Sequence, residues 1–195
     1  CAFGRHLKML KKAKVPVVGL DRFHHLLNDH PKRGRRLIAG DTRALPVRDC
    51  SLSGLYCLFN SFGYYERDEN REILKEWGRS LRSGGRAIFQ IPNGPVMAEI
   101  TREFAPRQML TGNFSMTESY EIIEDDLMME GRGCWEFSGE KQFWEFRMKL
   151  YSPAEIEDEL NAAGLMIVEL FEDYDESEFA ADDSAEMVIV CKKKS

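Results

Sequence analysis

Short apolar runs alternate with amphipathic segments over the first half of the chain. The runs that predict strands are 15–20, 36–39, 55–59 and 87–91. The segments whose apolar residues recur with helical spacing are 5–13, 22–29 and 68–81. Strands separated by helices indicate an α/β fold, in which helices cover both faces of a parallel sheet. Ligands of such sheets bind at the carboxyl ends of the strands.

Residues 95–150 interrupt this rhythm. They are rich in Met, Phe, Trp and Glu, and apolar and polar residues partly alternate over 118–123 and 143–150. Alternation of this kind predicts strands with one buried face. We therefore expect an inserted cap of antiparallel strands at 95–150, within a single domain that spans residues 1–195.

The helical pattern returns after the cap. Ser152, Pro153 and Glu155 have the spacing of a capping box with proline at the first helical position, and Gly164 ends the predicted helix. Closing strands are expected over 165–171 and 187–191, on either side of a loop that is crowded with Asp and Glu.

Composition narrows the class of protein. The chain has 195 residues, 43% of them hydrophobic, which is enough for one domain with its own core. No apolar run approaches the roughly 18 residues of a membrane span, and no signal peptide is recognisable, so we expect no membrane partner. Five cysteines without a CxxC spacing predict reduced thiols in a cytoplasmic protein, and no metal site.

Charge is divided unevenly along the chain, whose net charge is −6. Residues 1–50 carry 12 Lys and Arg against 4 Asp and Glu, whereas the remainder carries 15 against 29. The basic residues are interspersed, and no aromatic residues lie between them to stack on bases. We interpret them as a solvated face and expect no nucleic-acid partner.

The chain begins in a turn of small residues, Cys1-Ala2-Phe3-Gly4-Arg5-His6, and the first apolar run after it is followed by Asp21. This order is typical of a nucleoside site, because a tight turn lets the backbone approach the ligand and an acid accepts the ribose hydroxyls. The sequence contains no G-x-G-x-x-G and no G-x-x-x-x-G-K-[ST], which disfavours a dinucleotide dehydrogenase and nucleotide hydrolysis.

Further segments follow in the order and at the spacing of one known family. They are Gly40-Asp41-Thr42-Arg43-Ala44-Leu45-Pro46, Leu58-Phe59-Asn60-Ser61-Phe62-Gly63-Tyr64, Leu81-Arg82-Ser83-Gly84-Gly85-Arg86, Leu150-Tyr151-Ser152-Pro153 and Ala163-Gly164-Leu165. With the opening turn and Asp21, they resemble the class I S-adenosylmethionine-dependent methyltransferases that act on small molecules. The resemblance implies a Rossmann-like, doubly wound, mostly parallel sheet with an antiparallel last strand, and S-adenosylmethionine as cofactor with S-adenosylhomocysteine as product.

The resemblance also implies contacts with this cofactor. The backbone at Ala2, Phe3 and Gly4 would approach its methionine part, and Asp21 would accept both ribose hydroxyls. The remaining contacts would come from Asp41 and Thr42 to the adenine amino group, Leu45 and Arg22 to the ring, and Leu58, Phe59 and Asn60 at the end of a strand. Each acid has an alternative role, Asp21 as a helix cap and Asp41 as a turn residue.

Two features depart from the family pattern. Ala2 stands where the family usually has glycine, and its methyl group crowds the close approach of the cofactor. The central first strand of the family is missing before the turn, so we expect two half-sheets with open edges. We therefore expect a longer natural polypeptide, or another segment in the place of that strand.

Methyl transfer from a sulfonium is an in-line displacement, so the protein mainly aligns the acceptor and excludes water. A general base is needed only if the acceptor loses a proton. His6, Tyr64 and Tyr65 are the candidate catalytic residues, with Asn60 and Ser61 beside the tyrosines on the substrate side. In the alternative interpretation, the two tyrosines only pack beneath the cap.

Aromatic residues of the cap suggest a lid over the acceptor; they are Phe114, Tyr120, Trp135, Phe137, Phe143, Trp144 and Phe146. A core for the cap or a homodimer contact explains them equally well. The leading prediction is methyl transfer to an O, N or C atom of a small molecule. The alternatives are a catalytically inactive S-adenosylmethionine-binding module of the same fold, and an RNA or protein methyltransferase, although no basic groove is evident.

Overall fold

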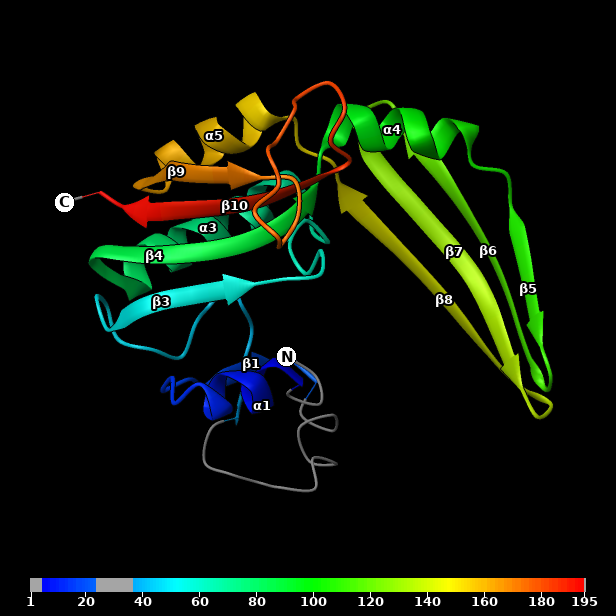
Figure 1. Cartoon of the computed structure of the whole chain (residues 1–195), viewed down its shortest axis with the longest axis horizontal. Helices are drawn as coiled ribbons and strands as arrows, with labels where there is room; N and C mark the ends of the chain where they lie inside the picture. Colours follow the sequence, from blue (N-terminus) through cyan, green and yellow to red (C-terminus); the bar gives the residue numbers. More distant parts are fainter. Residues whose placement is uncertain (1–4, 24–36, 195) are drawn as a thin grey trace. The chain divides into compact units, whose positions relative to one another are not determined.

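The computed structural model describes residues 5–23 and 37–194. The chain divides into two compact units, residues 1–49 and residues 50–195, which Figure 1 shows in the colours of the sequence. Each unit is described by itself. The prediction of a single domain over 1–195 stays a prediction.

The first unit contains one helix and one pair of parallel strands. These elements are α1 (Arg5–Lys12), β1 (Gly19–Asp21) and β2 (Leu37–Ala39). Asp21 lies opposite Ala39 in the parallel ladder. The strand predicted over 15–20 was too long at its start, because Pro16 has no N–H to give to a ladder and Val15 and Val18 are exposed. The helix predicted over 22–29 lies largely outside the described residues.

The second unit contains a mixed sheet with the strand order β3-β4-β10-β9. Its strands are β3 (Leu52–Cys57), β4 (Leu81–Pro92), β9 (Leu165–Phe171) and β10 (Glu186–Lys193). β3 and β4 are parallel, and β10 is antiparallel to both of its neighbours. The reversed last strand is therefore confirmed. Among the described residues, β1-β2 and β3-β4-β10-β9 form separate sheets, as the half-sheet prediction expects.

Helices α3 (Arg67–Ser80) and α5 (Pro153–Ala162) cover one face of the mixed sheet. They touch each other, since a Cβ on Gly78 would meet the Ala163 carbonyl. All four apolar residues predicted for the buried side of α3 are buried: Ile73, Leu74, Trp77 and Leu81. At the start of α5, Ser152 accepts from the Glu155 backbone and Glu155 accepts from the Ser152 backbone, which confirms the predicted capping box.

The core of the second unit is aromatic. Phe62, Trp77, Phe89 and Tyr151 are each at most 1% exposed, and their ring centroids lie 5.2 to 5.9 Å apart in the contacting pairs. Such pairs contribute beyond the burial of their area. They fix the segment after β3, because Phe62 belongs to the turn that carries the candidate site.

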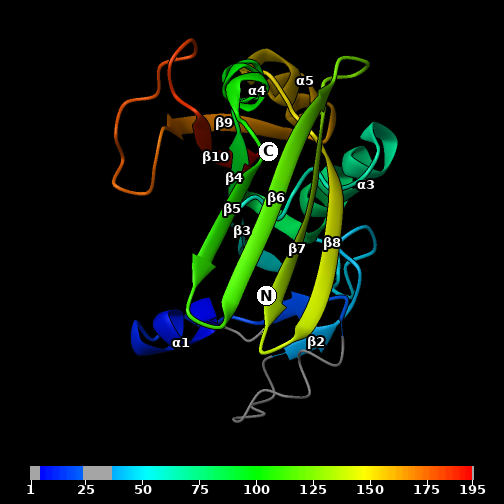
Figure 2. The same ribbon diagram turned by 90° about the vertical axis from the view of Figure 1, so that its right-hand side faces the viewer.

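The cap is an antiparallel meander with the order β5-β6-β7-β8 (Figure 2). Its strands are β5 (Arg107–Thr111), β6 (Phe114–Ile123), β7 (Met128–Phe137) and β8 (Glu140–Lys149). The predicted antiparallel strands of the cap are thus confirmed. A helix that the pattern did not predict, α4 (Gly94–Glu103), precedes them, and its Ala98 is buried with Met129 and Met148.

One end of the meander, which we call its root, contains Asp126 and Lys149. It is bonded to the rest of the second unit. The Lys149 backbone N–H donates to the Gly63 carbonyl at 2.8 Å, and Gly63 has φ 103°, where a side chain would also crowd the Lys149 carbonyl. Arg67 of α3 pairs with Asp126 of the β6–β7 turn at 2.6 Å. Both contacts hold the root of the meander near the segment that follows β3.

The structure bears on the membrane prediction in one respect. Within residues 5–23 and 37–194, none of the helices has the length and apolar character that crossing a bilayer requires.

Candidate functional site

In the first unit, two acids follow neighbouring parallel strands. Asp21 ends β1, and Asp41 comes two residues after β2, so both lie at the same edge of the small sheet. The Gly40 N–H donates to the Asp21 carbonyl at 3.0 Å. A Cβ at Gly40 would lie 3.2 Å from Leu20 and from Pro46, so only glycine fits there without a shift. The family resemblance singled out this edge for the nucleoside.

The two acids differ in their contacts. The Asp21 carboxylate accepts a hydrogen bond from the Phe23 backbone N–H at 3.0 Å. A bond between residues two apart is typical of a turn. Asp41 accepts the Arg43 backbone N–H at 2.9 Å and pairs with its guanidinium at 2.7 Å. These bonds lower the pKa of Asp41 to about 2. The sequence predicted the position of Asp41 but not its Arg43 partner. Thr42, which was expected beside the adenine, is half-buried in the same turn.

The other predicted residues of the first unit are only partly described. Ala2, Phe3 and Gly4 lie outside the described residues. His6 lies in the first turn of α1 and is half-buried, and Arg22 lies over the Phe23 ring at 5.1 Å. The roles assigned to these residues stay predictions.

In the second unit, the segment after β3 makes a tight turn. Phe59 and Asn60 both have left-handed backbone conformations, with φ 56° and φ 50°. The strand predicted over 55–59 was therefore wrong at its end, since β3 stops at Cys57 and Leu58 leads into the turn. The Ser61 hydroxyl donates to the Leu58 carbonyl at 2.8 Å. Left-handed non-glycine residues are costly and concentrate at functional sites.

A polar cluster lies beside this turn, at the carboxyl ends of β3 and β4. We call it the Glu186 cluster, and its members are Phe59, Asn60, Gln90, Tyr174 and Glu186. The Gln90 Oε1 accepts the Phe59 N–H at 3.0 Å. Asn60 Nδ2 and Gln90 Nε2 each donate to one Glu186 oxygen, at 3.3 Å in both cases. Asn60 Oδ1 is buried, and no described residue donates to it.

Burial raises the pKa of Glu186, and the two amide donors oppose that rise only in part. Asp173 raises it further, because it is also negative. No cation among the described residues pairs with Glu186. The cluster therefore holds a half-buried carboxylate that neutral amides orient and no positive charge neutralises.

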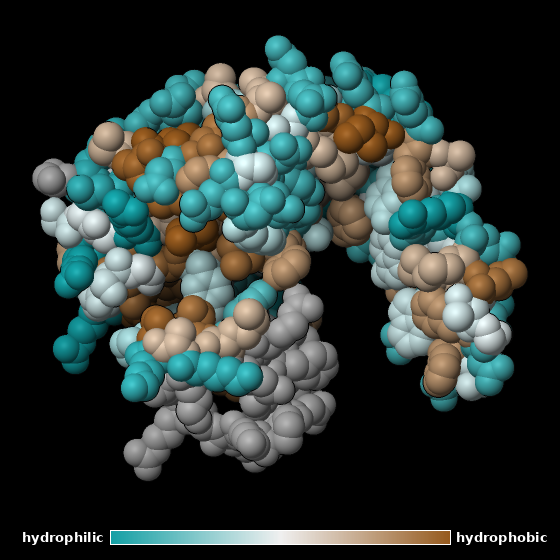
Figure 3. Space-filling model, in the orientation of Figure 1, coloured by the Kyte–Doolittle hydropathy of each residue, from teal (hydrophilic) through white to brown (hydrophobic). Residues whose placement is uncertain are grey.

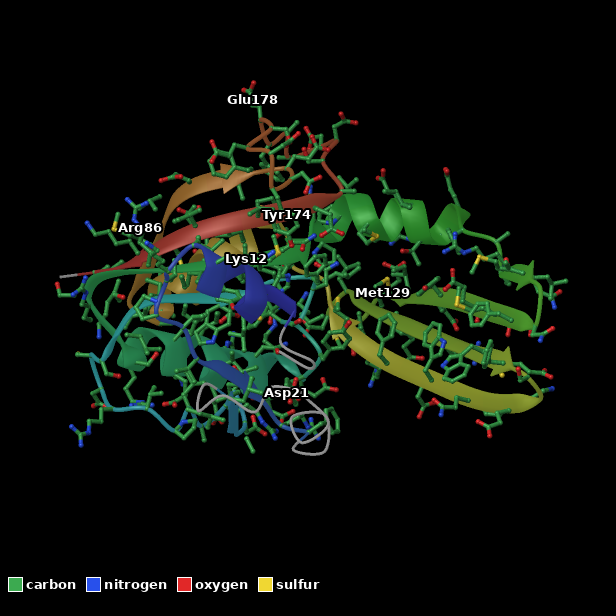
Figure 4. All side chains as sticks on the ribbon, turned by 60° about the horizontal axis from the view of Figure 1, so that its bottom comes forward. Lys12, Asp21, Arg86, Met129, Tyr174 and Glu178 are labelled. Atoms are coloured by element: carbon green, nitrogen blue, oxygen red, sulfur yellow. The ribbon has the colours of Figure 1, made fainter. Side chains whose placement is uncertain are left out.

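Tyr174 brings an aromatic ring to the cluster from the loop between β9 and β10 (Figure 4). Its ring centroid is 5.8 Å from that of Phe59, and its hydroxyl contacts Gln90 Oε1. The Phe59 and Tyr174 side chains are 53% and 45% exposed, so they form the open rim of the cluster.

Sequence reasoning missed three members of this cluster: Gln90, Tyr174 and Glu186. Each left a signal in the sequence. Gln90 is a polar residue inside an apolar strand, Tyr174 is the aromatic residue of an acidic loop, and Glu186 opens the last strand. The signals are weak one by one because the three residues meet only when β4 and β10 pair.

The two candidate catalytic tyrosines lie in different surroundings. The Tyr64 ring meets the Phe146 ring of β8 edge-on, with centroids 5.6 Å apart, and burial raises the pKa of Tyr64. The Tyr65 carbonyl accepts from Asn70 at 2.7 Å. Tyr64 thus faces the meander, as the packing alternative expects, and a catalytic role for either tyrosine stays a prediction.

One face of the meander carries most of its aromatic rings. Residues opposite one another in an antiparallel ladder share a face, and the register places six of the seven lid aromatics on one face: Phe114, Tyr120, Trp135, Phe137, Trp144 and Phe146. Phe143 lies on the other face. Figure 3 shows apolar and polar side chains interspersed along this sheet.

Two glycines of β7 make room for the rings. A Cβ at Gly131 would lie 2.4 Å from the Phe146 ring, and one at Gly133 would lie 2.5 Å from Trp144. The two rings are stacked, with an interplanar angle of 12°. Next to them Glu118 is 7% exposed and accepts from Tyr120 and Arg107. The result is a continuous group of contacting rings, Tyr120, Trp144 and Phe146, on one face of the meander.

The described part of the chain holds no candidate metal site, and two of its thiols have raised pKa values. No three His, Cys, Asp or Glu residues there are grouped to hold a metal ion. Burial raises the pKa of Cys57 to about 12 and that of Cys191 to about 11, so both thiols stay protonated and are poor nucleophiles.

Comparison with known proteins agrees with this geometry. Residues 1–89 match the family model described as a methyltransferase domain. Among curated protein sequences, none matches the chain. A solved S-adenosylmethionine-dependent methyltransferase from Clostridium acetobutylicum is similar over 100% of this chain and 82% of its own, with a TM-score of 0.87 and 16% identity.

Two further solved structures are similar over the whole of this chain. The CcbJ methyltransferase from Streptomyces caelestis has a TM-score of 0.80 at 20% identity, with 81% of its own length covered. CalS10, an amino pentose methyltransferase from Micromonospora echinaspora whose structure holds S-adenosylmethionine, has a TM-score of 0.67 at 18% identity, with 80% covered. The chain has the α/β fold of the S-adenosylmethionine-dependent methyltransferases, and its first 89 residues match the methyltransferase-domain model.

Proposed function

We propose that the chain methylates an amine nitrogen of a small molecule, and that the Glu186 cluster holds this amine. The observation that carries the proposal is the half-buried Glu186 carboxylate, which two side-chain amides orient and no described cation neutralises. It lies at the carboxyl ends of β3 and β4, the edge at which sheets of this kind bind ligands.

The charge of the cluster favours an amine over other acceptors. A nitrogen that attacks a methyl group gains positive charge, and a fixed carboxylate stabilises that charge as it develops. A hydroxyl acceptor must instead lose its proton as it attacks, for which a carboxylate is a weak base. The exposed rings of Phe59 and Tyr174 add faces that attract cations.

Several described groups have the chemistry to hold the cofactor. In the first unit, the Asp21 carboxylate suits the ribose hydroxyls and the edge beside Gly40 suits a flat base. When bound, S-adenosylmethionine supplies a methyl group on a cationic sulfur. Asp41 would serve the adenine through an oxygen that Arg43 already contacts.

This chain's own residues would then act on the acceptor in three ways. Glu186 accepts an N–H of the amine and so orients the nitrogen lone pair toward the methyl group, Asn60 and Gln90 keep the carboxylate in place, and the rings of Phe59 and Tyr174 contact the acceptor at the rim. The acceptor reacts as its neutral amine; after transfer the methylated nitrogen is an ammonium ion that pairs with Glu186, and its extra proton is lost to solvent.

The similar structures include an amino pentose methyltransferase, CalS10, and a sugar N-methyltransferase, KedS8, from Streptoalloteichus. They support a small amine but do not name the acceptor of this chain. The aromatic face of the meander is suited to cover a ring or an apolar part of such a molecule.

The test has two steps. Calorimetry first measures whether the protein binds S-adenosylmethionine and S-adenosylhomocysteine. Product formation is then measured on matched pairs of acceptors that differ only in carrying an amine or a hydroxyl, for example glucosamine and glucose. Methylation of the amines alone is expected.

Glu186→Gln should abolish most of that activity and leave cofactor affinity unchanged. Glu178→Gln is the matched control, since Glu178 is an exposed acid of the same loop as Tyr174 (Figure 4). Cofactor binding without turnover on any acceptor would favour the inactive-module alternative. Methylation of hydroxyls with full activity in Glu186→Gln would overturn the amine assignment.

A further inference from the structure

The outer strand of the meander has an open edge. β8 pairs with β7 on one side, and no described strand lies on its other side (Figure 2). The β7–β8 ladder runs from Met128–Lys149 to Phe137–Glu140 without a bulge, and β8 contains no proline. Natural proteins usually shorten, bend or cover such edges, because their unpaired backbone groups accept another strand.

The side chains along this edge are exposed in an ordered pattern. Phe143 is 80% exposed, more than any other large hydrophobic side chain described. Lys141 and Glu145 lie two residues to either side of it, on the same face of the sheet. Lys141 Nζ is 3.4 Å from Glu136 of β7, but its side chain is still 58% exposed. A cation, a ring and an anion therefore line the edge in that order.

We propose that two copies of the chain pair through β8, antiparallel, about a two-fold axis at Phe143. The two meanders would then form one continuous eight-stranded sheet, since each contributes the four strands of its own. A two-fold interface places the same surface of each copy against the other. Here each Phe143 would meet its own copy, and each Lys141 would meet the partner's Glu145.

The charge pattern selects this register over its neighbours. Residues paired across the new ladder must share a face, so the axis must pass through a residue rather than between two. An axis at Lys141 or Glu145 places two like charges directly opposite each other. An axis at Trp144 places Lys141 against Arg147, and an axis at Gln142 makes no pair of opposite charges.

An axis nearer the root of the meander is excluded by burial. Centring on Phe146 would pair the partner's strand with Leu150 and Tyr151, which are 0% and 1% exposed within the second unit. Centring on Phe143 uses only Gly139 to Arg147, where the edge is accessible. Opposite charges across a strand pair stabilise it, and like charges destabilise it.

The other edge of the meander provides a control. β5 spans only five residues, Arg107–Thr111, and also carries an exposed apolar side chain, Leu110, which is 69% exposed. Its shorter ladder offers fewer backbone groups to a partner. A substitution at Leu110 therefore tests for non-specific association through apolar surface.

The test is sedimentation velocity of the full chain over a concentration series. The wild type should be a dimer, and Glu145→Lys and Lys141→Glu should each raise the dimer dissociation constant at least about tenfold. The double variant Lys141→Glu/Glu145→Lys should restore the dimer, because the pairs are reversed but still opposite. Leu110→Lys should leave the dimer intact, and circular dichroism should show that every variant is folded.

Three results would overturn the proposal. They are a wild type that stays monomeric at all concentrations, a double variant that remains monomeric although it is folded, and a loss of the dimer in Leu110→Lys equal to that in Glu145→Lys. The measurement needs no substrate, so it is independent of the acceptor assignment.

Discussion

Two carboxylates at strand ends, one in each unit, have opposite electrostatic surroundings. Asp41 follows β2 and is held by the Arg43 guanidinium, which with the Arg43 N–H lowers its pKa to about 2. Glu186 opens β10 and is held by two neutral amides, and burial raises its pKa. Both positions look alike in the sequence, as an acid beside an apolar run.

The difference shows that the partner of a carboxylate, more than its position, determines what it can do. Asp41 is already neutralised by a cation of its own chain, so a positively charged ligand gains less from it. Glu186 has oriented oxygens and no cation, so a positively charged ligand gains the full attraction. The first carboxylate suits structure or the binding of a neutral base, and the second suits an amine.

The largest expected effect comes from removing the Glu186 charge. Glu186→Gln keeps the size of the side chain but lacks the charge that stabilises a developing cation, and it keeps only one of the two oxygens that accept from Asn60 and Gln90, so kcat/KM for an amine acceptor should fall about 100-fold. Steady-state kinetics with a fixed excess of cofactor measure it. Asp41→Asn is the comparison, and if it reduced kcat as strongly, the two acids would not differ in role.

The next largest effect separates cofactor binding from turnover. Asp21→Ala removes the proposed ribose acceptor and should weaken S-adenosylmethionine binding by about 1–3 kcal/mol, as measured by calorimetry. Glu186→Gln should leave this affinity unchanged. An Asp21→Ala protein with wild-type affinity would assign the ribose to another group and leave Asp21 with the turn contact to Phe23.

Much of the fold was predictable because local rules decided it. The helix with Trp77 on its buried face and the capping box of Ser152 and Glu155 depend on spacing within a few residues. The end of β3 was not predictable in the same way. Phe59 continues the apolar run, but it takes a left-handed conformation in which its N–H donates to Gln90, 31 residues away.

The candidate functional residues also fall into those that local sequence could indicate and those that only distant contacts bring together. Asp21, Asp41 and Asn60 were identified as candidates because each lies at or shortly after the end of an apolar run. Tyr174 and Glu186 were not, because a loop and an antiparallel strand bring them to the end of β3 from the last quarter of the chain. Local pattern thus predicts which polar residues lie near the end of a strand, whereas contacts between distant segments decide which charges are left unneutralised.

A smaller effect is expected at the rim of the Glu186 cluster. Tyr174→Phe keeps the ring beside Phe59 but removes the hydroxyl that contacts Gln90. Loss of one hydrogen bond of this kind costs about 0.5–1.5 kcal/mol, so kcat/KM should fall by about 2- to 10-fold. Tyr174→Leu, which also removes the ring, should raise KM for an amine further. Equal effects of the two variants would mean that the ring does not contact the acceptor.

The smallest effect is on stability, and it should have opposite sign at the two acids. The lowered pKa of Asp41 means that its charge stabilises the fold above its ordinary pKa of 3.8, a contribution that is lost as the pH falls toward about 2. The raised pKa of Glu186 means that its protonated form is favoured by folding, a contribution present at low pH that is lost as the pH rises through the raised value. At neutral pH, Asp41→Asn should therefore lower the unfolding temperature and Glu186→Gln should raise it, each by the equivalent of less than about 1 kcal/mol, because solvent screens both groups.

Thermal unfolding followed by circular dichroism at neutral and at mildly acidic pH measures both. The gain from Glu186→Gln should shrink in acid, where the wild-type carboxyl is protonated and already neutral. A gain that stayed constant with pH would come from packing, and the contrast between the two carboxylates would then not be electrostatic.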